Sequence, residues 1–179
     1  MQGVSELFRR HPILLRLALV ALLAELGCAI IVPTLPLYLS EVLKAPDRLI
    51  GGVVTAFAVV ETFCQGPFGA LGDRMGRKPL LLGGLLVAAL TPLAMTLIRA
   101  PVWFVPLRAL DGGGSAALWP AILATVGDEV GAADRATGMQ LFNVTYLIGL
   151  GLGPPLGFWI THAAGSRAVA LYTASALMG

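Results

Sequence analysis

Four ionisable side chains of this sequence stand inside long apolar runs: Glu25, Glu61, Arg108 and Asp111. A charged side chain at the centre of a bilayer costs about 2.5–3.5 kcal/mol on insertion scales. At about 1.5 Å of rise per helical residue, Glu25 and Glu61 each lie about 18 Å from the start of their runs, near mid-membrane. Carboxylates at that depth typically carry protons or bind a charged substrate. These residues are therefore the first candidates for a functional site.

A purely structural role competes with the functional one for some of these residues. Arg108 and Asp111 are three positions apart and can simply neutralise each other on one helix, so both interpretations stay open. Glu25 and Glu61 have no obvious local partner in the sequence, which favours a functional role. Asn143 adds a polar side chain from another apolar run. Polar groups from several helices can meet only around a water-filled cavity or a buried network.

The elements that must position these residues are membrane-spanning helices. The chain of 179 residues is 57% hydrophobic and 12% charged, about half the charge of an ordinary soluble domain. Five runs reach the roughly 20 residues that a bilayer core requires. They cover residues 13–39, 49–71, 79–98, 102–130 and 136–161. A sixth, 167–179, rises only about 20 Å and is an incomplete span. We expect residues 1–179 to be an all-α integral membrane bundle, cut short within its sixth helix.

Several other protein classes find no support in the sequence. The basic residues are dispersed, which argues against nucleic-acid binding. Cys28 and Cys64 sit inside apolar runs and are expected to be buried thiols, although a disulfide stays open. His11 and His162 are far apart, so no metal site is expected. Without a nucleophile beside a base, or a metal cluster, we expect neither an enzyme nor a cofactor.

The distribution of Lys and Arg predicts an orientation. With the N-terminus inside, seven cations lie at cytoplasmic ends: Arg9, Arg10, Arg16, Arg74, Arg77, Lys78 and Arg135. Four lie at outer ends: Lys44, Arg48, Arg99 and Arg167. This bias follows the positive-inside rule. The first apolar run is longer than the core of a signal peptide, so we interpret it as an uncleaved helix in the plasma (inner) membrane.

The stretch GALGDRMGRKP, residues 69–79, places four charges between two apolar runs. A positive-inside loop explains its cations, but neither Asp73 nor the glycine spacing. Gly69 removes a side chain where another helix can approach closely. Gly76 can supply a left-handed turn at a helix end. Asp73 can accept hydrogen bonds from a neighbouring helix N-terminus or pair with Arg77.

This stretch resembles the signature loop of the major facilitator superfamily, G-x-L-x-D-R-x-G-R-R/K. Every position of that pattern is filled, by Gly69, Leu71, Asp73, Arg74, Gly76, Arg77 and Lys78. Its place between the second and third predicted helices, on the predicted inner side, agrees with the pattern. The resemblance implies a charged latch that holds the cytoplasmic side closed. A stretch at 127–138, which looks like the family's acidic-then-arginine connector, adds Asp128 to that latch.

Other stretches extend the resemblance over nearly the whole chain. Residues 107–117, LRALDGGGSAA, look like the family's R-x-x-Q-G-x-G-x-A motif, with Asp111 in place of the glutamine. Residues 33–38, PTLPLY, resemble the P-x-x-P-x-Y helix ending of exporter branches. A glycine-rich stretch is similar to the G-x-x-x-G-P-x-x-G-G motif of proton-coupled drug exporters, through Gly149, Gly153, Pro154 and Gly157. Phe158 replaces its last glycine and Gln140 the distant upstream one.

The glycine-rich stretch also has a physical interpretation. Gly149, Gly153 and Gly157 fall four apart on one helix face, which suits close helix packing. Pro154 removes a backbone donor and bends the helix. The alternatives are tight static packing and a rocking interface. The resemblance favours rocking, against a partner helix expected in a second half of the fold.

The resemblance implies a secondary transporter that works by alternating access, with this chain as its N-terminal six-helix half and the C-terminal half missing. We expect proton-coupled export of small molecules, with Glu25, Glu61, Arg108, Asp111 and Asn143 lining the cavity. Its expected partners are the lipid bilayer, a small-molecule substrate, protons and the missing half of the same transporter. A proton symporter for a nutrient or metabolite is the first alternative. A transport-inactive membrane fragment is the second.

Overall fold

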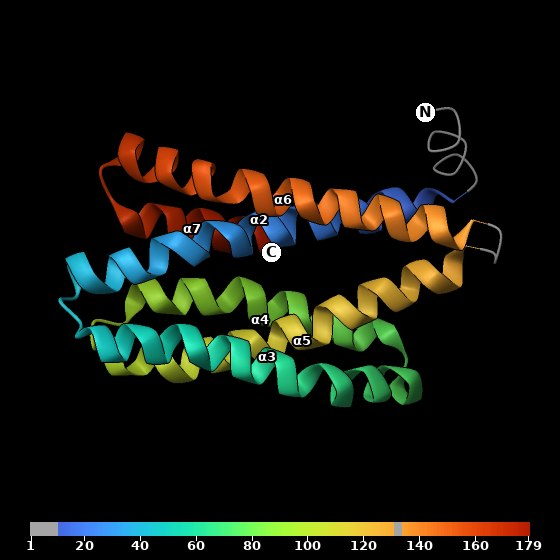
Figure 1. Ribbon diagram of the computed structural model, residues 1–179, viewed down its shortest axis with the longest axis horizontal. Coiled ribbons are helices and arrows are strands. Elements are labelled where there is room, and N and C mark those ends of the chain that lie inside the picture. Colours follow the sequence, from blue (N-terminus) through green and yellow to red (C-terminus); the bar gives the residue numbers. More distant parts are fainter. Residues whose placement is uncertain (1–10, 131–133) are drawn as a thin grey trace.

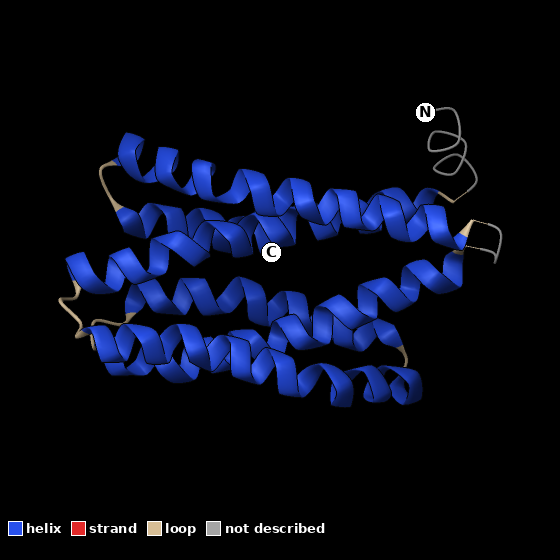
Figure 2. Cartoon of the chain, viewed as in Figure 1, coloured by secondary structure: helices blue, strands red, loops and turns tan. Residues whose placement is uncertain are grey.

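The computed structural model describes residues 11–130 and 134–179, and every regular element in them is helical (Figures 1 and 2). The elements are α2 (Pro12–Leu37), η1 (Tyr38–Val42), α3 (Asp47–Met75), α4 (Arg77–Leu97), η2 (Pro101–Trp103), α5 (Phe104–Glu129), α6 (Arg135–Ala164) and α7 (Arg167–Met178). Each predicted span corresponds to one of these helices, with ends displaced by a few residues. Arg9 and Arg10, used in the orientation prediction, lie outside the described residues.

The end of the first span differs from the predicted helix. α2 contains Pro33 and Pro36 and passes into η1, a π-helical turn. Leu43 donates its N–H to the Tyr38 carbonyl, five residues earlier, at 3.2 Å. Proline lacks the amide donor that a regular α-helix requires, and a wider turn re-satisfies the backbone groups that it leaves free.

Glycines mark two of the helix ends. Gly76 separates α3 from α4 with φ 86° and ψ 157°. The positive φ agrees with the prediction, but the extended ψ is a conformation that is essentially restricted to glycine, and not a left-handed turn. Gly165 ends α6 in the left-handed conformation, with φ 63° and ψ 13°. A glycine at that position is a common way to stop a helix.

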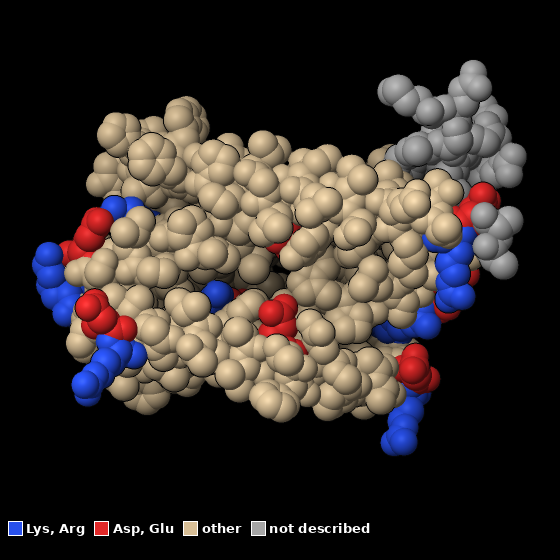
Figure 3. All heavy atoms as spheres, viewed as in Figure 1, with Lys and Arg blue, Asp and Glu red and all other residues tan. Residues whose placement is uncertain are grey.

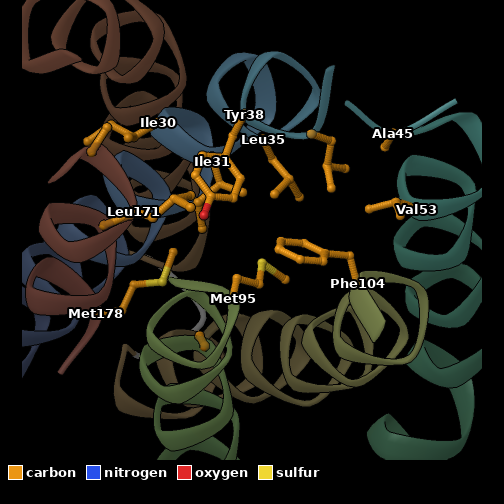
Figure 4. Close-up of a cluster of buried hydrophobic side chains, with 14 residues drawn as sticks. Ile30, Ile31, Leu35, Tyr38, Ala45, Val53, Met95, Phe104, Leu171 and Met178 are labelled. Carbon is orange, nitrogen blue, oxygen red and sulfur yellow. The ribbon is translucent and has the colours of Figure 1, made fainter. Parts of the chain in front are cut away.

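The helices form two layers (Figure 1). α2 packs against α6 and α7 in one layer, and α5 packs against α3 and α4 in the other. The α4–α7 contact joins the layers. Near the η1 end, a buried apolar cluster includes Ile31, Tyr38, Met95, Phe104 and Leu171 (Figure 4). It ties α2, α4, α5 and α7 together, so that end of the bundle is closed by packed side chains.

Most charged side chains gather at the two ends of the molecule, and a broad belt with few charged groups, most of them around the central hollow, separates those ends (Figure 3). One end carries the α3–α4 and α5–α6 connections, and the other carries the α2–α3, α4–α5 and α6–α7 connections. The described members of the two predicted sets of cations therefore lie at opposite ends of the molecule. This distribution is that of a multi-pass membrane protein.

Among the described helices, four are long and apolar enough to cross a membrane: α2 with η1, α3, α4 and α6. The sequence predicted five full spans. α5 has the length, at 26 residues, but its ionisable side chains and glycines lower its hydropathy. Half of its residues are buried, including Arg108 and Asp111. The other helices shield the polar groups of α5 from lipid. α5 can therefore lie within the bundle although it is less apolar than the other long helices.

Candidate functional site

A cavity of about 520 Å³ opens between α3, α5 and α6. Figure 3 shows a hollow between the two layers near the middle of one face. The cavity is lined by Glu61, Gln65, Trp119, Leu123, Met139, Phe142, Asn143 and Tyr146. Its lining combines one carboxylate and two amides with aromatic and aliphatic walls. A concave, mostly apolar site with a few convergent polar groups is the usual form of a small-molecule site.

The carboxylate of Glu61 is held by a neighbouring helix. Ser115 on α5 donates its hydroxyl to Glu61 Oε1 on α3 at 2.5 Å. Ser115 is buried, while Glu61 is half-buried and reaches the cavity. The hydrogen bond therefore orients an acid at the cavity wall and leaves the rest of that carboxylate available to a bound molecule.

Three aromatic residues form another part of the wall. Trp119 on α5 meets Tyr146 on α6 edge to face, with ring centroids 5.5 Å apart and planes at 86°. Trp119 also meets Phe142 edge to face at 6.0 Å. Such edge-to-face pairs favour a fixed geometry, and aromatic faces attract organic cations.

A buried ion pair lies on α5, outside the cavity lining. Arg108 and Asp111 are both 5% exposed, and Arg108 Nη1 donates to Asp111 Oδ2. The guanidinium of Arg108 also lies over the ring of Phe57 on α3, 4.2 Å from its centroid. Local pairing, which the sequence left open, is therefore present. The pair has additional partners, so it is part of a network that joins helices.

Thr91 on α4 completes this network. Its hydroxyl is 2.9 Å from Asp111 Oδ1 and 3.0 Å from the Val87 carbonyl. A threonine hydroxyl has a single proton to donate. It can donate to the carboxylate of Asp111 or to the Val87 carbonyl, but not fully to both. If it donates to the Val87 carbonyl, its oxygen can accept a hydrogen bond from the hydroxyl of a protonated, neutral Asp111.

Glu25 occupies a different environment, between α2 and α6. It is 4% exposed, and a Cβ added at Gly149 would lie 2.8 Å from the Glu25 Cβ. Among the described residues, no hydrogen bond or ion pair engages its carboxylate. The glycine therefore makes room for a buried acid, which explains part of the glycine pattern of α6.

The glycine face of α6 packs within this chain, which corrects one prediction. Gly153 faces Ala29, and Gly157 faces Ile30 and Thr34, all on α2. The sequence interpretation assigned this face to a helix of a second half. α2 takes that place because the three glycines leave room for its larger side chains Glu25 and Ile30 and allow the backbone at Ala29 to approach closely.

The predicted cavity residues separate into two groups. Glu61 and Asn143 line the cavity together. Glu25, Arg108 and Asp111 are buried between packed helices and lie outside that lining. Sequence reasoning missed Thr91 and Phe57, because a threonine in an apolar run typically bonds its own helix and a phenylalanine there fits any lipid-facing position.

At the α3–α4 end, Arg77 has a different partner from Asp73, which the sequence suggested. Arg77 forms an ion pair with Asp128 and donates to the carbonyl of Ala124, both on α5. The α5 C-terminus carries negative partial charge, so it attracts a cation from the first turn of α4. Asp73, a predicted partner of Arg77, lies exposed at the end of α3.

The structure also corrects the prediction that another helix approaches closely at Gly69. A Cβ added there would meet nothing within 4 Å, so no helix approaches closely at that residue in this chain. The close approach falls at Gly72, where an added Cβ would lie 3.1 Å from Leu80 of α4. The two glycines are three positions apart, and the crossing of α3 and α4 decides which of them is covered.

The helical layers, the belt with few charged groups and the polar cavity define a multi-pass membrane protein with an internal site. The family model described as Major Facilitator Superfamily matches residues 17–179. The chain belongs to the major facilitator superfamily, a family of transport proteins.

Curated relatives agree with that family and differ in what their names describe. The inner membrane transport protein YajR of Escherichia coli is 34% identical over 82% of this chain and 32% of its own length. The multidrug resistance protein MdtG of Dickeya zeae is 27% identical over 93% of this chain and 41% of its length. The class G tetracycline resistance protein of Vibrio anguillarum is 30% identical over 90% and 42%. The chain thus spans less than half the length of these relatives.

Proposed function

We propose that the protein containing this chain is a proton-coupled exporter of small molecules, with residues 1–179 as its N-terminal half. The observation that carries this proposal is the cavity, in which the Glu61 carboxylate faces an aromatic wall of Trp119 and Tyr146. An acid beside aromatic faces suits a lipophilic cation. The names of two relatives, a multidrug and a tetracycline resistance protein, support export.

The proposed proton sites are two buried carboxylates outside the cavity lining, those of Asp111 and Glu25. Protonation of Asp111 removes its charge and weakens its pairing with Arg108, while Thr91 can turn to the Val87 carbonyl. Glu25 lies at the α2–α6 contact, so its charge acts on the packing of those two helices. A change at either site can therefore bias the helix arrangement around the cavity, which alternating access requires.

We further propose that the protein lies in the plasma (inner) membrane with its N-terminus in the cytoplasm. The predicted inner end includes the basic turn between α3 and α4, whose Arg77 pairs with Asp128. In this orientation the Arg77–Asp128 pair fastens the cytoplasmic ends of α4 and α5. Transport, and not catalysis, is the activity that this arrangement supports.

The main test of the exporter proposal is Glu25→Gln in the intact gene product, assayed in inverted membrane vesicles. We expect the variant to insert normally and to lose export driven by a proton gradient, because the amide cannot carry the proton. Glu41→Gln is the matched control, since Glu41 lies in η1 at one end of the molecule, in an exposed pair with Arg167. Undiminished export by Glu25→Gln would refute the proposal.

The alternative, a proton symporter, predicts that protons and substrate enter the cell together. Addition of substrate to intact cells would then alkalinise the medium as protons enter with it. The inactive-fragment alternative is tested by the mass of the native product in membranes, detected with an antibody to the N-terminal segment. A band near 18.6 kDa, the mass of this chain, would favour it, whereas one of twice that mass or more would favour a complete transporter.

A further inference from the structure

The ion pair on α5 and the cavity acid on α3 belong to the same helix interface. Phe57 lies under the guanidinium of Arg108, whose Cζ is 4.2 Å from the ring centroid. One turn further along α3, Glu61 accepts the hydrogen bond of Ser115. Between these contacts, a Cβ added at Gly112 would overlap the Phe57 carbonyl oxygen, so the two backbones lie against each other. The ion pair and the cavity acid are therefore held on adjoining turns of one close helix contact.

A group of charged residues surrounds this contact. Cys28 of α2 lies within electrostatic range of all its members, which are Glu25, Glu61, Arg108 and Asp111. Figure 3 shows acidic and basic side chains together at the central hollow. Tyr146 of α6 faces the two glutamates from the other side. Arg108 is the cation of the group and the other three are acids, so these acids compete for its positive charge.

Arg108 has donor capacity beyond its bond to Asp111. A guanidinium carries five N–H groups, and Nη1 donates to Asp111 Oδ2. Nε of Arg108 is buried and has no hydrogen-bond partner among the residues that the structure describes. An unsatisfied buried donor is costly, and a buried cation requires an anion beside it. The position of Arg108 therefore depends on the charge of Asp111.

Protonation of Asp111 affects the two members of the pair differently. The hydroxyl of a protonated Asp111 can donate to Thr91, whose own hydroxyl then turns to the Val87 carbonyl. Asp111 thus keeps a partner in its neutral form. Arg108 stays protonated at any accessible pH and is left without its counter-charge on α5.

Glu61 is the carboxylate that can replace Asp111 as the partner of Arg108. It follows Phe57 by four residues, about 6 Å of helix rise, and the guanidinium already lies on the Phe57 ring. Ser115 engages Oε1 of Glu61, so Oε2 remains available as an acceptor. The same carboxylate faces the cavity, where it can hold a cationic substrate.

We propose that Arg108 couples proton binding to substrate release by changing its carboxylate partner. It pairs with Asp111 while that acid is ionised, and with Glu61 after Asp111 has taken up one proton. A cation held by Glu61 then loses its counter-charge and leaves the cavity. One proton replaces one monovalent cation, so the net charge of the group is unchanged. Arg108 acts on the substrate through Glu61 and is a positioning residue; the inference rests on the proposed export of a cation.

The first test is equilibrium binding of rhodamine 6G, a fluorescent lipophilic cation, to the intact gene product in detergent. Asp111→Asn imitates the protonated acid and should weaken binding about tenfold or more, because Arg108 then occupies Glu61. Addition of Arg108→Gln to that variant should restore most of the lost affinity. Glu41→Gln, which breaks an exposed pair with Arg167, is the control and should leave the affinity unchanged.

The double variant decides between partner exchange and a structural role. If it binds as weakly as Asp111→Asn alone, the exchange is overturned, since removal of a merely structural arginine gives no reason for recovery. Absence of rhodamine 6G binding to the wild type would refute the cation site on which the inference rests. Asp111→Gln, the residue of the resembled motif at this position, repeats the test if Asp111→Asn does not fold.

A second measurement requires neither a substrate nor a proton gradient. Double-mutant cycles of Arg108→Gln and Glu61→Gln, read from SDS-induced unfolding, give the coupling between the two residues. With Asp111→Asn in the background, that coupling should shift the unfolding equilibrium about tenfold more than with Asp111 present. Equal coupling in both backgrounds would contradict the exchange. Because the cycles are independent of the Glu25→Gln export test, the exporter proposal and the partner exchange can fail separately.

Discussion

At the scale of single residues, the buried polar groups matter through the partners that the fold supplies. Glu25 and Glu61 have equivalent places in their apolar runs. Glu61 accepts a hydrogen bond at a cavity wall, whereas Glu25 packs against Gly149 of α6. Asp111 has two donors, Arg108 and Thr91. Identical side chains at similar depth therefore have different surroundings.

Removal of the Thr91 hydroxyl should destabilise the protein. Thr91→Val keeps the shape but leaves Asp111 Oδ1 without that donor, which should cost about 1–3 kcal/mol of unfolding free energy. Thr96→Val on the same helix is the control, because the Thr96 hydroxyl is exposed and bonds only the Leu93 carbonyl. SDS-induced unfolding of the purified protein measures both. Equal losses in the two variants would contradict the structural role assigned to Thr91.

Substitution of Gly76 should be costly for a backbone reason. Gly76→Ala forces a β-carbon into a conformation of φ 86° and ψ 157°, with an expected cost of about 1–3 kcal/mol. Gly69→Ala, in a regular helical turn with open space around it, should be tolerated. Comparison of the two thermal midpoints checks this. A Gly76→Ala midpoint at or above that of Gly69→Ala would be inconsistent with the turn described.

At the scale of elements, the α2–α6 interface depends on small residues. A Cβ added at Gly153 would lie 2.9 Å from the Ala29 carbonyl carbon, a contact that packed helices do not allow. Backbones that approach this closely gain van der Waals contact in lipid, where there is no hydrophobic force between helices. The glycine face thus holds α6 on α2 and, through Gly149, positions Glu25.

Gly153→Ala should therefore weaken this helix pair by about 1–3 kcal/mol, as overpacking does elsewhere. Gly151→Ala is the internal control, because a Cβ there would meet nothing within 4 Å and alanine favours helix. Unfolding free energy in detergent is the measurement. If the two variants were equally stable, the close α2–α6 contact would be wrong.

At the scale of the whole molecule, the charges at the two ends predict how the chain sits in a membrane. In a background of Cys28→Ala and Cys64→Ala, Lys44→Cys and Lys78→Cys place single thiols at opposite ends. A membrane-impermeant thiol reagent added to intact cells should label only Lys44→Cys. The reverse pattern would invert the proposed orientation, and labelling of both would contradict a bundle that spans the membrane once per helix.

Much of the architecture was predictable from the sequence. Apolar runs of sufficient length specify membrane helices because an unpaired backbone is too costly in lipid, so all six helices were predicted close to their observed bounds. The GALGDRMGRKP stretch identified the family, which the match over residues 17–179 confirms. The distribution of charge to two ends also followed from the same runs.

Which polar side chains from different helices pair with one another could be determined only from the tertiary structure. The sequence suggested Asp73 for Arg77, but the crossing of α4 and α5 supplies Asp128. It placed five residues around one cavity, of which only Glu61 and Asn143 line it. Helical period tells which residues share a face, but the rotation of each helix about its axis is set by packing with all its neighbours. Sequence thus determined the helices and the family, and packing alone decided which polar groups meet.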